Sequence, residues 1–299
     1  ARSPFDILEQ SIPKMVLITV YLVWAALMCM LGSVVTKQYI LLFQMITFST
    51  TSPVVFKLIC DLLVFLMLLK GIYNISKTST IFFYLAYWIL FLHVYYIDEF
   101  RFVRLTTFFL QGGTHQFSDW LDVYLGFLGY ELCLFLFPYV SKHTKFFRAV
   151  HRGNLLLTVT YLIVSFICFG FFSYQQVRTI MYPFVNLLAY IELPFVERIE
   201  SLLFPLFIFK ILITALMYTW AAVEILRRIF PRAHYRKLCL YVMLGSFLIS
   251  HFPQVLREAD LWVRTLGYAQ FFASFAFTLL LLFLLFLKKM FHKEETPDA

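Results

Sequence analysis

Long apolar runs dominate the chain, and short stretches of polar or turn-forming residues separate them. A helix needs about 20 mostly apolar residues to cross a bilayer, so each run predicts a membrane-spanning helix. The turns include Ser49–Pro53 and Gln111–Gly113, which are rich in Ser, Thr, Gly and Pro. Eight spans are predicted, of which the seventh is short: Met15–Val35, Val54–Leu69, Thr80–Ile97, Leu121–Val140, Leu155–Ser173, Leu202–Leu226, Leu238–Ser250 and Tyr268–Leu287.

The composition excludes a soluble globular domain. Of the 299 residues, 62% are hydrophobic and only 14% are charged, whereas soluble domains carry about 45–50% apolar and about 25% charged residues. The five cysteines all lie in apolar runs and form no Cys-x-x-Cys pair, so neither a disulfide scaffold nor a zinc site is expected. The sequence therefore predicts an all-α polytopic membrane protein with eight transmembrane helices.

Charge along the chain predicts its orientation. With the N-terminus inside, most of the 25 lysines and arginines fall on the cytoplasmic side, as the positive-inside rule requires. Both termini are therefore expected in the cytoplasm. The net charge of +8 is explained by this topology and by contact with anionic lipid of the bilayer, so no nucleic-acid partner is expected.

Glu131 is the strongest candidate for a functional residue, because a charge near mid-bilayer costs at least about 2.5–3.5 kcal/mol. It lies in the middle of its predicted span and follows Gly126, Gly129 and Tyr130. Two glycines three residues apart weaken a helix, and broken membrane helices present their ends to bound ligands. We expect these four residues to bind ligand. Alternatively, the glycines permit close helix packing and Glu131 caps a neighbouring group.

Lys210 is a second charged residue inside a predicted span. Thr214 and Tyr218 follow it at helical spacing, so the three form one polar stripe. Lys210 and Thr214 are therefore further ligand-binding candidates. Similar depth and opposite charge suggest an ion pair between Glu131 and Lys210, and the alternative is that Lys210 snorkels or pairs elsewhere.

Two charged groups near helix ends are assigned structural or coupling roles. Lys57 and Asp61 are four residues apart and can pair on one face of a helix. Glu197, Arg198 and Glu200 open the sixth span, where acidic groups suit the helix dipole.

Enzyme signatures are absent from the sequence. It contains no H-E-x-x-H, no G-x-S-x-G and no glycine-rich phosphate loop, and its seven histidines are far apart. No enzyme activity, metal or cofactor is therefore expected. His93 lies alone in an apolar run, where a packing role is more common than catalysis.

Five motifs spread over nearly the whole chain are shared with one family. They are Phe5–Gln10, Thr51–Pro53, Gly71–Lys77, Gly129–Glu131 with Pro138, and Pro194–Glu200. Through these motifs the chain resembles the spore germination permeases, which are the GerAB-type B subunits of germinant receptors. They belong to the amino acid–polyamine–organocation transporter superfamily. The chain departs from the family pattern at Lys77, where the family tends to have arginine.

The resemblance implies a fold of ten helices in two inverted five-helix repeats. Residues 121–288 resemble the second repeat, and residues 1–97 resemble an incomplete first repeat within a single domain of residues 1–299. The eight spans thus correspond to helices three to ten, and the true start of the protein is expected upstream.

The resemblance also implies a function. Such a subunit senses a small nutrient, commonly an amino acid, in the inner spore membrane, together with an A-type membrane subunit and a C-type lipoprotein. A ligand at Gly126–Glu131 would shift the balance between two helix packings that the partners read. The alternatives are an active amino-acid permease of the cell membrane and a membrane enzyme built around His93.

Overall fold

The computed structural model describes residues 4–46, 50–106, 116–141, 143–191 and 199–294, and every regular element within them is helical. The elements are α1 (Pro4–Ser11), α2 (Lys14–Ile46), α3 (Pro53–Leu68), α4 (Ile72–Tyr87), η1 (Trp88–Tyr96), α5 (Val103–Thr106), α6 (Phe117–Leu125), α7 (Leu132–Leu136), η2 (Phe137–Tyr139), α8 (Phe146–Phe172), α9 (Tyr174–Val177), α10 (Pro183–Leu188), α11 (Ile199–Ile229), α12 (Tyr235–Ile249) and α13 (Leu256–Glu294).

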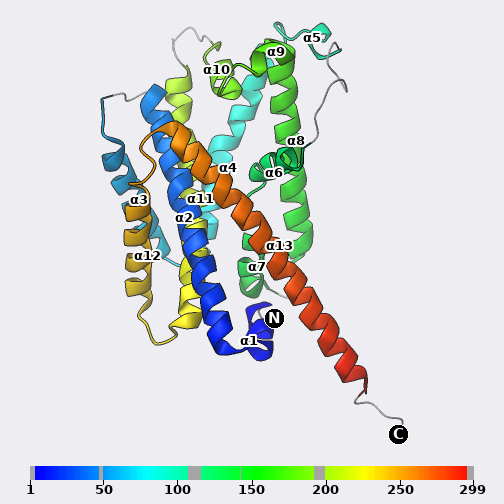
Figure 1. Ribbon diagram of the computed structural model, residues 1–299. Coiled ribbons are helices and arrows are strands. Elements are labelled where there is room, and N and C mark those ends of the chain that lie inside the picture. Colours follow the sequence, from blue (N-terminus) through cyan, green and yellow to red (C-terminus); the bar gives the residue numbers. More distant parts are fainter. Residues whose placement is uncertain (1–3, 47–49, 107–115, 142, 192–198, 295–299) are drawn as a thin grey trace.

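Helices α2 and α11 form the centre of the bundle and pack along each other (Figure 1). Helices α3 and α12 contact them on one side, while α13 crosses α2 obliquely and reaches α6. The short helices α5, α9 and α10 gather at one end of the bundle, and α1 lies at the opposite end, where α13 also finishes. The all-α architecture expected from the apolar runs is therefore confirmed.

A glycine permits the close approach of the two central helices. A Cβ atom added to Gly32 on α2 would lie 3.0 Å from Cβ of Tyr218 on α11, tighter than almost any real contact. Alanines at 215, 221 and 222 of α11 are likewise buried. Small residues let helix backbones come together in a membrane, where van der Waals packing replaces the hydrophobic effect as the main attraction.

Five helices within the described residues are long and apolar enough to cross a membrane: Lys14–Ile46, Ile72–Tyr96, Phe146–Phe172, Leu202–Ile229 and Leu256–Met290. The other three predicted spans are also helical but differ in form. Helices α3 and α12 have only 16 and 15 residues, about 24 Å or less at 1.5 Å per residue, and Leu121–Val140 is divided into α6, α7 and η2. The count of eight spans is therefore not established.

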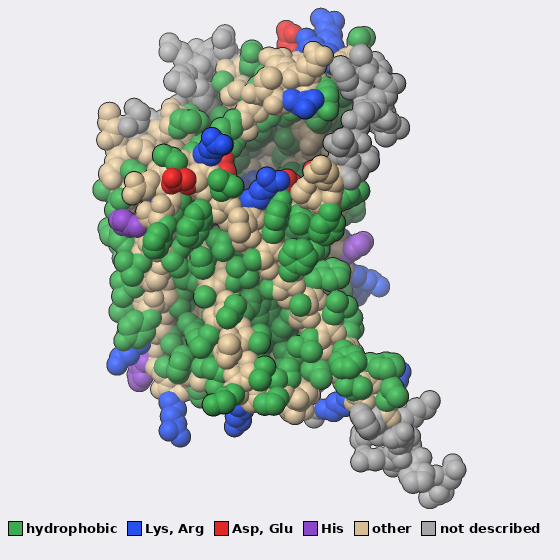
Figure 2. All heavy atoms as spheres, viewed as in Figure 1, with side chains coloured by type: hydrophobic (Ala, Val, Ile, Leu, Met, Phe, Trp, Pro, Cys, Tyr) green, Lys and Arg blue, Asp and Glu red, His purple; other side chains and the backbone are tan. Residues whose placement is uncertain are grey.

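The surface has the banded character of a membrane protein. Figure 2 shows hydrophobic side chains covering the middle of one face, with Lys and Arg at its lower edge and both charge signs around a hollow near its upper end. Exposed apolar residues include Leu162 (65%), Leu248 (65%) and Leu282 (58%) on three different helices. Such large apolar surfaces are stable against lipid rather than water.

The motif Phe5–Gln10 has a clear structural role at the lower end of the bundle. Phe5 on α1 is buried and its ring lies 5.1 to 6.0 Å from those of Trp24, Phe135 and Phe277. Arg228 at the end of α11 pairs with the carboxylates of Asp6 (3.0 Å) and Glu9 (2.9 Å) of this motif. The motif thus anchors α1 across the ends of the long helices.

The first long helix extends beyond the span predicted from its apolar run. Lys37 lies two residues beyond the predicted end of the first span at Val35, but α2 continues to Ile46 and Lys37 is buried within it, with 4% exposure. Residues 36 to 38 are polar, but an apolar stretch follows them. The helix therefore continues through this short polar segment.

Candidate functional site

The helix break predicted from two glycines is present. Helix α6 ends at Leu125, α7 begins at Leu132, and residues 126 to 131 form consecutive turns between them. Gly129 has φ of +111°, a conformation that side-chain-bearing residues rarely adopt. Turn hydrogen bonds join the Leu132 amide to the Gly129 carbonyl and the Cys133 amide to the Tyr130 carbonyl. The interruption therefore follows from the sequence at Gly129.

The carboxylate of Glu131 lies buried at this break, with 1% of the residue exposed. Its Oε2 accepts a hydrogen bond from the Gly129 amide at 2.9 Å, and its Oε1 accepts one from the Tyr218 hydroxyl at 2.8 Å. Both donors are neutral groups. A buried carboxylate held by these neutral donors can gain from a cationic partner, because opposite charges attract more strongly at low dielectric.

Aromatic residues surround the break on the side of α8 and α13. The Tyr161 hydroxyl of α8 donates to the carbonyl of Gly126 at 2.8 Å, which satisfies a carbonyl that the broken helix leaves free. Tyr124 packs edge-on against Tyr130 and Phe271, with ring centroids 5.7 and 4.8 Å apart. Tyr130 itself is 44% exposed. These contacts hold the turn in place while leaving one aromatic ring accessible.

Of the three polar residues in the stripe on α11, only Tyr218 hydrogen-bonds to Glu131 at the break. Tyr218 reaches Glu131, whereas the Thr214 hydroxyl donates to the Lys210 carbonyl one turn away. Lys210 lies eight residues before Tyr218, about 12 Å along the helix axis. Among the described residues, the hydrogen-bond partners of Glu131 do not include Lys210. Similar depth in two predicted spans was therefore too coarse a criterion to predict a contact between Glu131 and Lys210.

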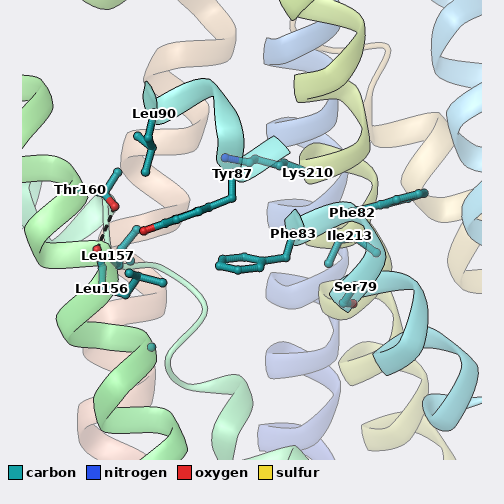
Figure 3. Close-up of a pocket in the computed structure, with 11 residues that line it drawn as sticks. Ser79, Phe82, Phe83, Tyr87, Leu90, Leu156, Leu157, Thr160, Lys210 and Ile213 are labelled. Carbon is teal, nitrogen blue, oxygen red and sulfur yellow. Dashed lines mark hydrogen bonds between the residues drawn. The ribbon is translucent and has the colours of Figure 1, made fainter. Parts of the chain in front are cut away.

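Lys210 instead borders an apolar cavity of about 440 Å³ between α4, α8 and α11. Figure 3 shows Phe83 and Tyr87 of α4 on one side of this space, opposite Leu157 and Thr160 of α8. The other described lining residues are uncharged, and the Lys210 ammonium lies 5.7 Å from the ring of Phe207. The cavity is therefore a separate feature from the Glu131 site.

The ion pair expected from the spacing of Lys57 and Asp61 is present. The Lys57 Nζ atom lies 2.5 Å from Asp61 Oδ1, and both residues are buried on α3. The remaining coupling candidates are less completely described. Glu197 and Arg198 lie outside the described residues, and Glu200 falls in the first turn of α11 with its side chain outside the description.

Sequence reasoning missed a carboxylate near the N-terminal end of α13. Asp260 accepts hydrogen bonds from Gln38 Nε2 at 2.6 Å and from the Tyr182 hydroxyl at 2.8 Å. Burial and this carboxylate raise the pKa of the Tyr182 phenol, so the phenol stays protonated and keeps donating. It was missed because α13 begins twelve residues before the predicted span at Tyr268 and therefore includes Asp260.

His93 is accounted for by packing. Its Nδ1 lies 2.7 Å from the Leu90 carbonyl, and its ring stacks on Phe184 at 6.0 Å between centroids. Within the described part of the chain, no group of three or more His, Cys, Asp or Glu side chains is arranged to hold a metal ion.

These features define a polytopic helical membrane protein with a buried carboxylate at a broken helix. The chain belongs to the spore germination protein family, whose model matches residues 2–259. The family is a germination permease family and not a recognised class of enzyme.

Individual relatives carry germination names. The chain is 27% identical to spore germination protein A2 of Bacillus subtilis (strain 168) over 169 residues, which is 56% of this chain and 46% of that protein. It is 24% identical to spore germination protein B2 of the same strain over 220 residues, 67% of this chain and 55% of that protein. It is 27% identical to spore germination protein GerQB of Bacillus cereus over 94 residues, 31% of this chain and 26% of that protein.

The chain thus spans about half the length, or less, of the curated relatives it matches. No solved structure matches it significantly.

Proposed function

We propose that this protein is a germinant-sensing integral-membrane subunit of a spore germination receptor. The observation that carries the proposal is the buried Glu131 carboxylate, held at a helix break by the Gly129 amide and the Tyr218 hydroxyl. A charge with two neutral donors at a glycine-based break is a good receptor for the ammonium group of a small nutrient such as an amino acid. Membership of a germination family supports the same reading.

The proposed mechanism exchanges one partner of Glu131 for another. A ligand ammonium that binds Oε1 displaces the Tyr218 hydroxyl, and Tyr218 lies on α11 where this helix packs against Gly32 of α2. The exchange favours a packing of the two central helices in which Tyr218 is released. Only the difference in ligand affinity between the two packings drives this shift.

In this proposal, Gly126, Gly129, Tyr130 and Glu131 form the ligand site. An α-amino acid is too short to reach Lys210 and Glu131 together, given the two helical turns between Lys210 and Tyr218. The cavity that Lys210 borders is therefore a separate part of the receptor, and Thr214 donates a hydrogen bond to the Lys210 carbonyl on the same helix.

The family resemblance extends the proposal to partners and orientation. We propose that the subunit signals to an A-type membrane subunit and a C-type lipoprotein, and that both ends of this chain face the cytoplasm. Helix α1 and the end of α13 lie at the same end of the bundle (Figure 1), which supports placing both on the same side of the membrane. We also retain residues 1–97 and 121–288 as the two proposed repeats.

The test is Glu131→Gln in spores that carry this gene as their sole receptor of its type. Glutamine keeps the size of the side chain but removes the charge, so the response to the cognate amino acid should fall by at least about tenfold in apparent affinity, equivalent to about 1.4 kcal/mol. Germination is followed as loss of optical density against germinant concentration, and an immunoblot of spore membranes confirms the amount of protein.

Glu224→Gln is the matched control, because Glu224 is a partly buried glutamate of α11 that hydrogen-bonds Tyr139 and Arg227 away from the break. It should leave the dose-response curve unchanged. An unchanged curve in Glu131→Gln would remove Glu131 from the site. Uptake of labelled amino acid by vegetative cells that express the gene would instead favour the permease alternative.

A further inference from the structure

A second buried polar cluster joins three helices inside the bundle. On α3, the Lys57 ammonium contacts Asp61 Oδ1 and also donates to Ser246 Oγ on α12 at 3.2 Å. The Ser246 carbonyl in turn accepts a hydrogen bond from the Ser33 hydroxyl on α2 at 2.5 Å. Ser33, Lys57 and Ser246 are 1 to 3% exposed and Asp61 is 9% exposed. The cluster therefore ties α3, α12 and α2 together through one lysine.

One atom of this cluster lacks a partner. Asp61 Oδ2 is buried and has no hydrogen bond within the described part of the chain. Buried carboxylate oxygens nearly always have a partner, since leaving one unsatisfied costs free energy. Its neighbour Oδ1 contacts Lys57, so Oδ2 is the oxygen of this carboxylate with capacity for a further partner.

The surrounding charges decide which ligand fits. Lys57 already supplies a positive charge beside Asp61, and Lys37 on α2 is a second buried cation that the charge of Lys57 influences. The other titratable groups facing the pair are the thiols of Cys29 on α2 and Cys60 on α3. From α12 the pair meets the neutral hydroxyl of Ser246.

A metal ion is disfavoured in such surroundings, because like charges repel strongly at low dielectric. The cluster also offers one carboxylate, whereas hard cations take six or more oxygen ligands. A proton needs a single oxygen and cancels the charge of the carboxylate it joins.

We propose that Asp61 Oδ2 is a proton-binding site inside the membrane and that its occupancy controls the junction of α3 with α12 and α2. A proton from hydronium in the acidified solution forms the O–H bond at Oδ2 and leaves a water molecule behind, and the carboxylate becomes a neutral acid beside the Lys57 ammonium. The Lys57 ammonium then has no counter-ion, and a buried unpaired charge is costly. The helices respond by letting Lys57 move towards water, which breaks its bond to Ser246.

The experiment measures the carboxyl group itself. The full-length protein is reconstituted in lipid nanodiscs and acidified stepwise from about pH 9 to about pH 2, a range that brackets carboxyl titration in proteins. Infrared difference spectra record the C=O stretch of each carboxyl that becomes protonated. We expect a band characteristic of a buried carboxylic acid that is missing from Asp61→Asn.

Asp122→Asn is the matched control, because Asp122 is an aspartate paired with Arg264 at an exposed site of α6. It should retain the buried band. Glu131→Gln identifies any contribution from the other buried carboxyl group. A spectrum of Asp61→Asn identical to that of the unaltered protein overturns the proposal, as does the absence of any titrating band that depends on Asp61.

Should Asp61→Asn fail to accumulate, the double variant Lys57→Met with Asp61→Asn removes the unpaired lysine and serves in its place. Because the infrared measurement uses no germinant, it is independent of the function proposed above. A lost band at Asp61 with a normal germinant response in Glu131→Gln would uphold this site and overturn that function.

Discussion

Two buried carboxylates in the same bundle are stabilised in opposite ways. Asp61 lies in the uninterrupted helix α3, and its partner is the lysine one turn before it. Glu131 lies at the break between α6 and α7, and its partners are a backbone amide and a tyrosine hydroxyl. The same requirement, to stabilise a negative charge away from water, is met by an ion pair in one place and by neutral dipoles in the other.

The difference follows from the backbone. In a continuous helix, every interior amide donates to a carbonyl four residues before it, so a buried side chain must find its donors on other side chains. A broken helix frees amides such as that of Gly129, which can then serve a carboxylate directly. Among the described residues, the hydrogen-bond partners of Glu131 are therefore neutral groups, and the function proposed above has one of them exchanged for a ligand.

The largest effect is expected from removing the fixed counter-ion. Lys57→Met leaves Asp61 as an unpaired buried charge, and breaking a buried pair in this way costs about 3–5 kcal/mol. We expect a large fall in the midpoint temperature of unfolding, measured by tryptophan fluorescence on the purified protein in detergent micelles. We also expect less of the protein in spore membranes. The double variant Lys57→Met with Asp61→Leu should recover most of the loss. If the double variant were no more stable than the single one, the pair would not be the cause.

Removing a neutral donor should cost less. Tyr218→Phe deprives Glu131 Oε1 of its hydrogen bond with almost no change in volume, and one unsatisfied buried acceptor costs about 1–3 kcal/mol. The same unfolding measurement detects the change. Tyr39→Phe is the matched control, since it deletes a tyrosine hydroxyl that donates to the Phe204 carbonyl far from the break. A Tyr218→Phe variant as unstable as Lys57→Met would contradict the contrast between the two sites.

The backbone of the break gives a smaller effect. Gly129→Ala places a Cβ on a residue with φ of +111°, and such conformations cost L-residues about 1–2 kcal/mol. There is space for the methyl group, whose nearest neighbour would be Leu132 at 4.0 Å, so the cost is conformational. Gly126→Ala is the comparison, because Gly126 has φ of −66° and its added Cβ would lie 3.3 Å from the Val123 carbonyl oxygen and 3.4 Å from the Tyr161 ring, which a small shift accommodates. Equal stability of the two variants would show that the left-handed turn is not required.

Local features of both sites were predictable from sequence, and distant partners were not. Glycines three residues apart predicted the break, and a spacing of four residues predicted the Lys57–Asp61 pair. In contrast, Ser246 is 189 residues from Lys57 and Tyr218 is 87 residues from Glu131. Such contacts depend on how helices rotate and slide against each other, which hydropathy alone does not fix. For the same reason the sequence suggested Lys210 as the partner of Glu131, although Tyr218 occupies that position.

The smallest effect is expected where an ion pair is exposed. Arg227 pairs with Glu224 at 3.1 Å three residues before it on α11, and the Arg227 side chain is 51% exposed. Water and salt screen such a pair, which is worth about 0.2–1 kcal/mol. Arg227→Gln should therefore change the unfolding midpoint only slightly, and added salt should reduce even that difference. Because this pair and Lys57–Asp61 both lie within a single helix, the comparison isolates burial as the variable. A loss as large as that of Lys57→Met would mean that burial does not explain the importance of the inner pair.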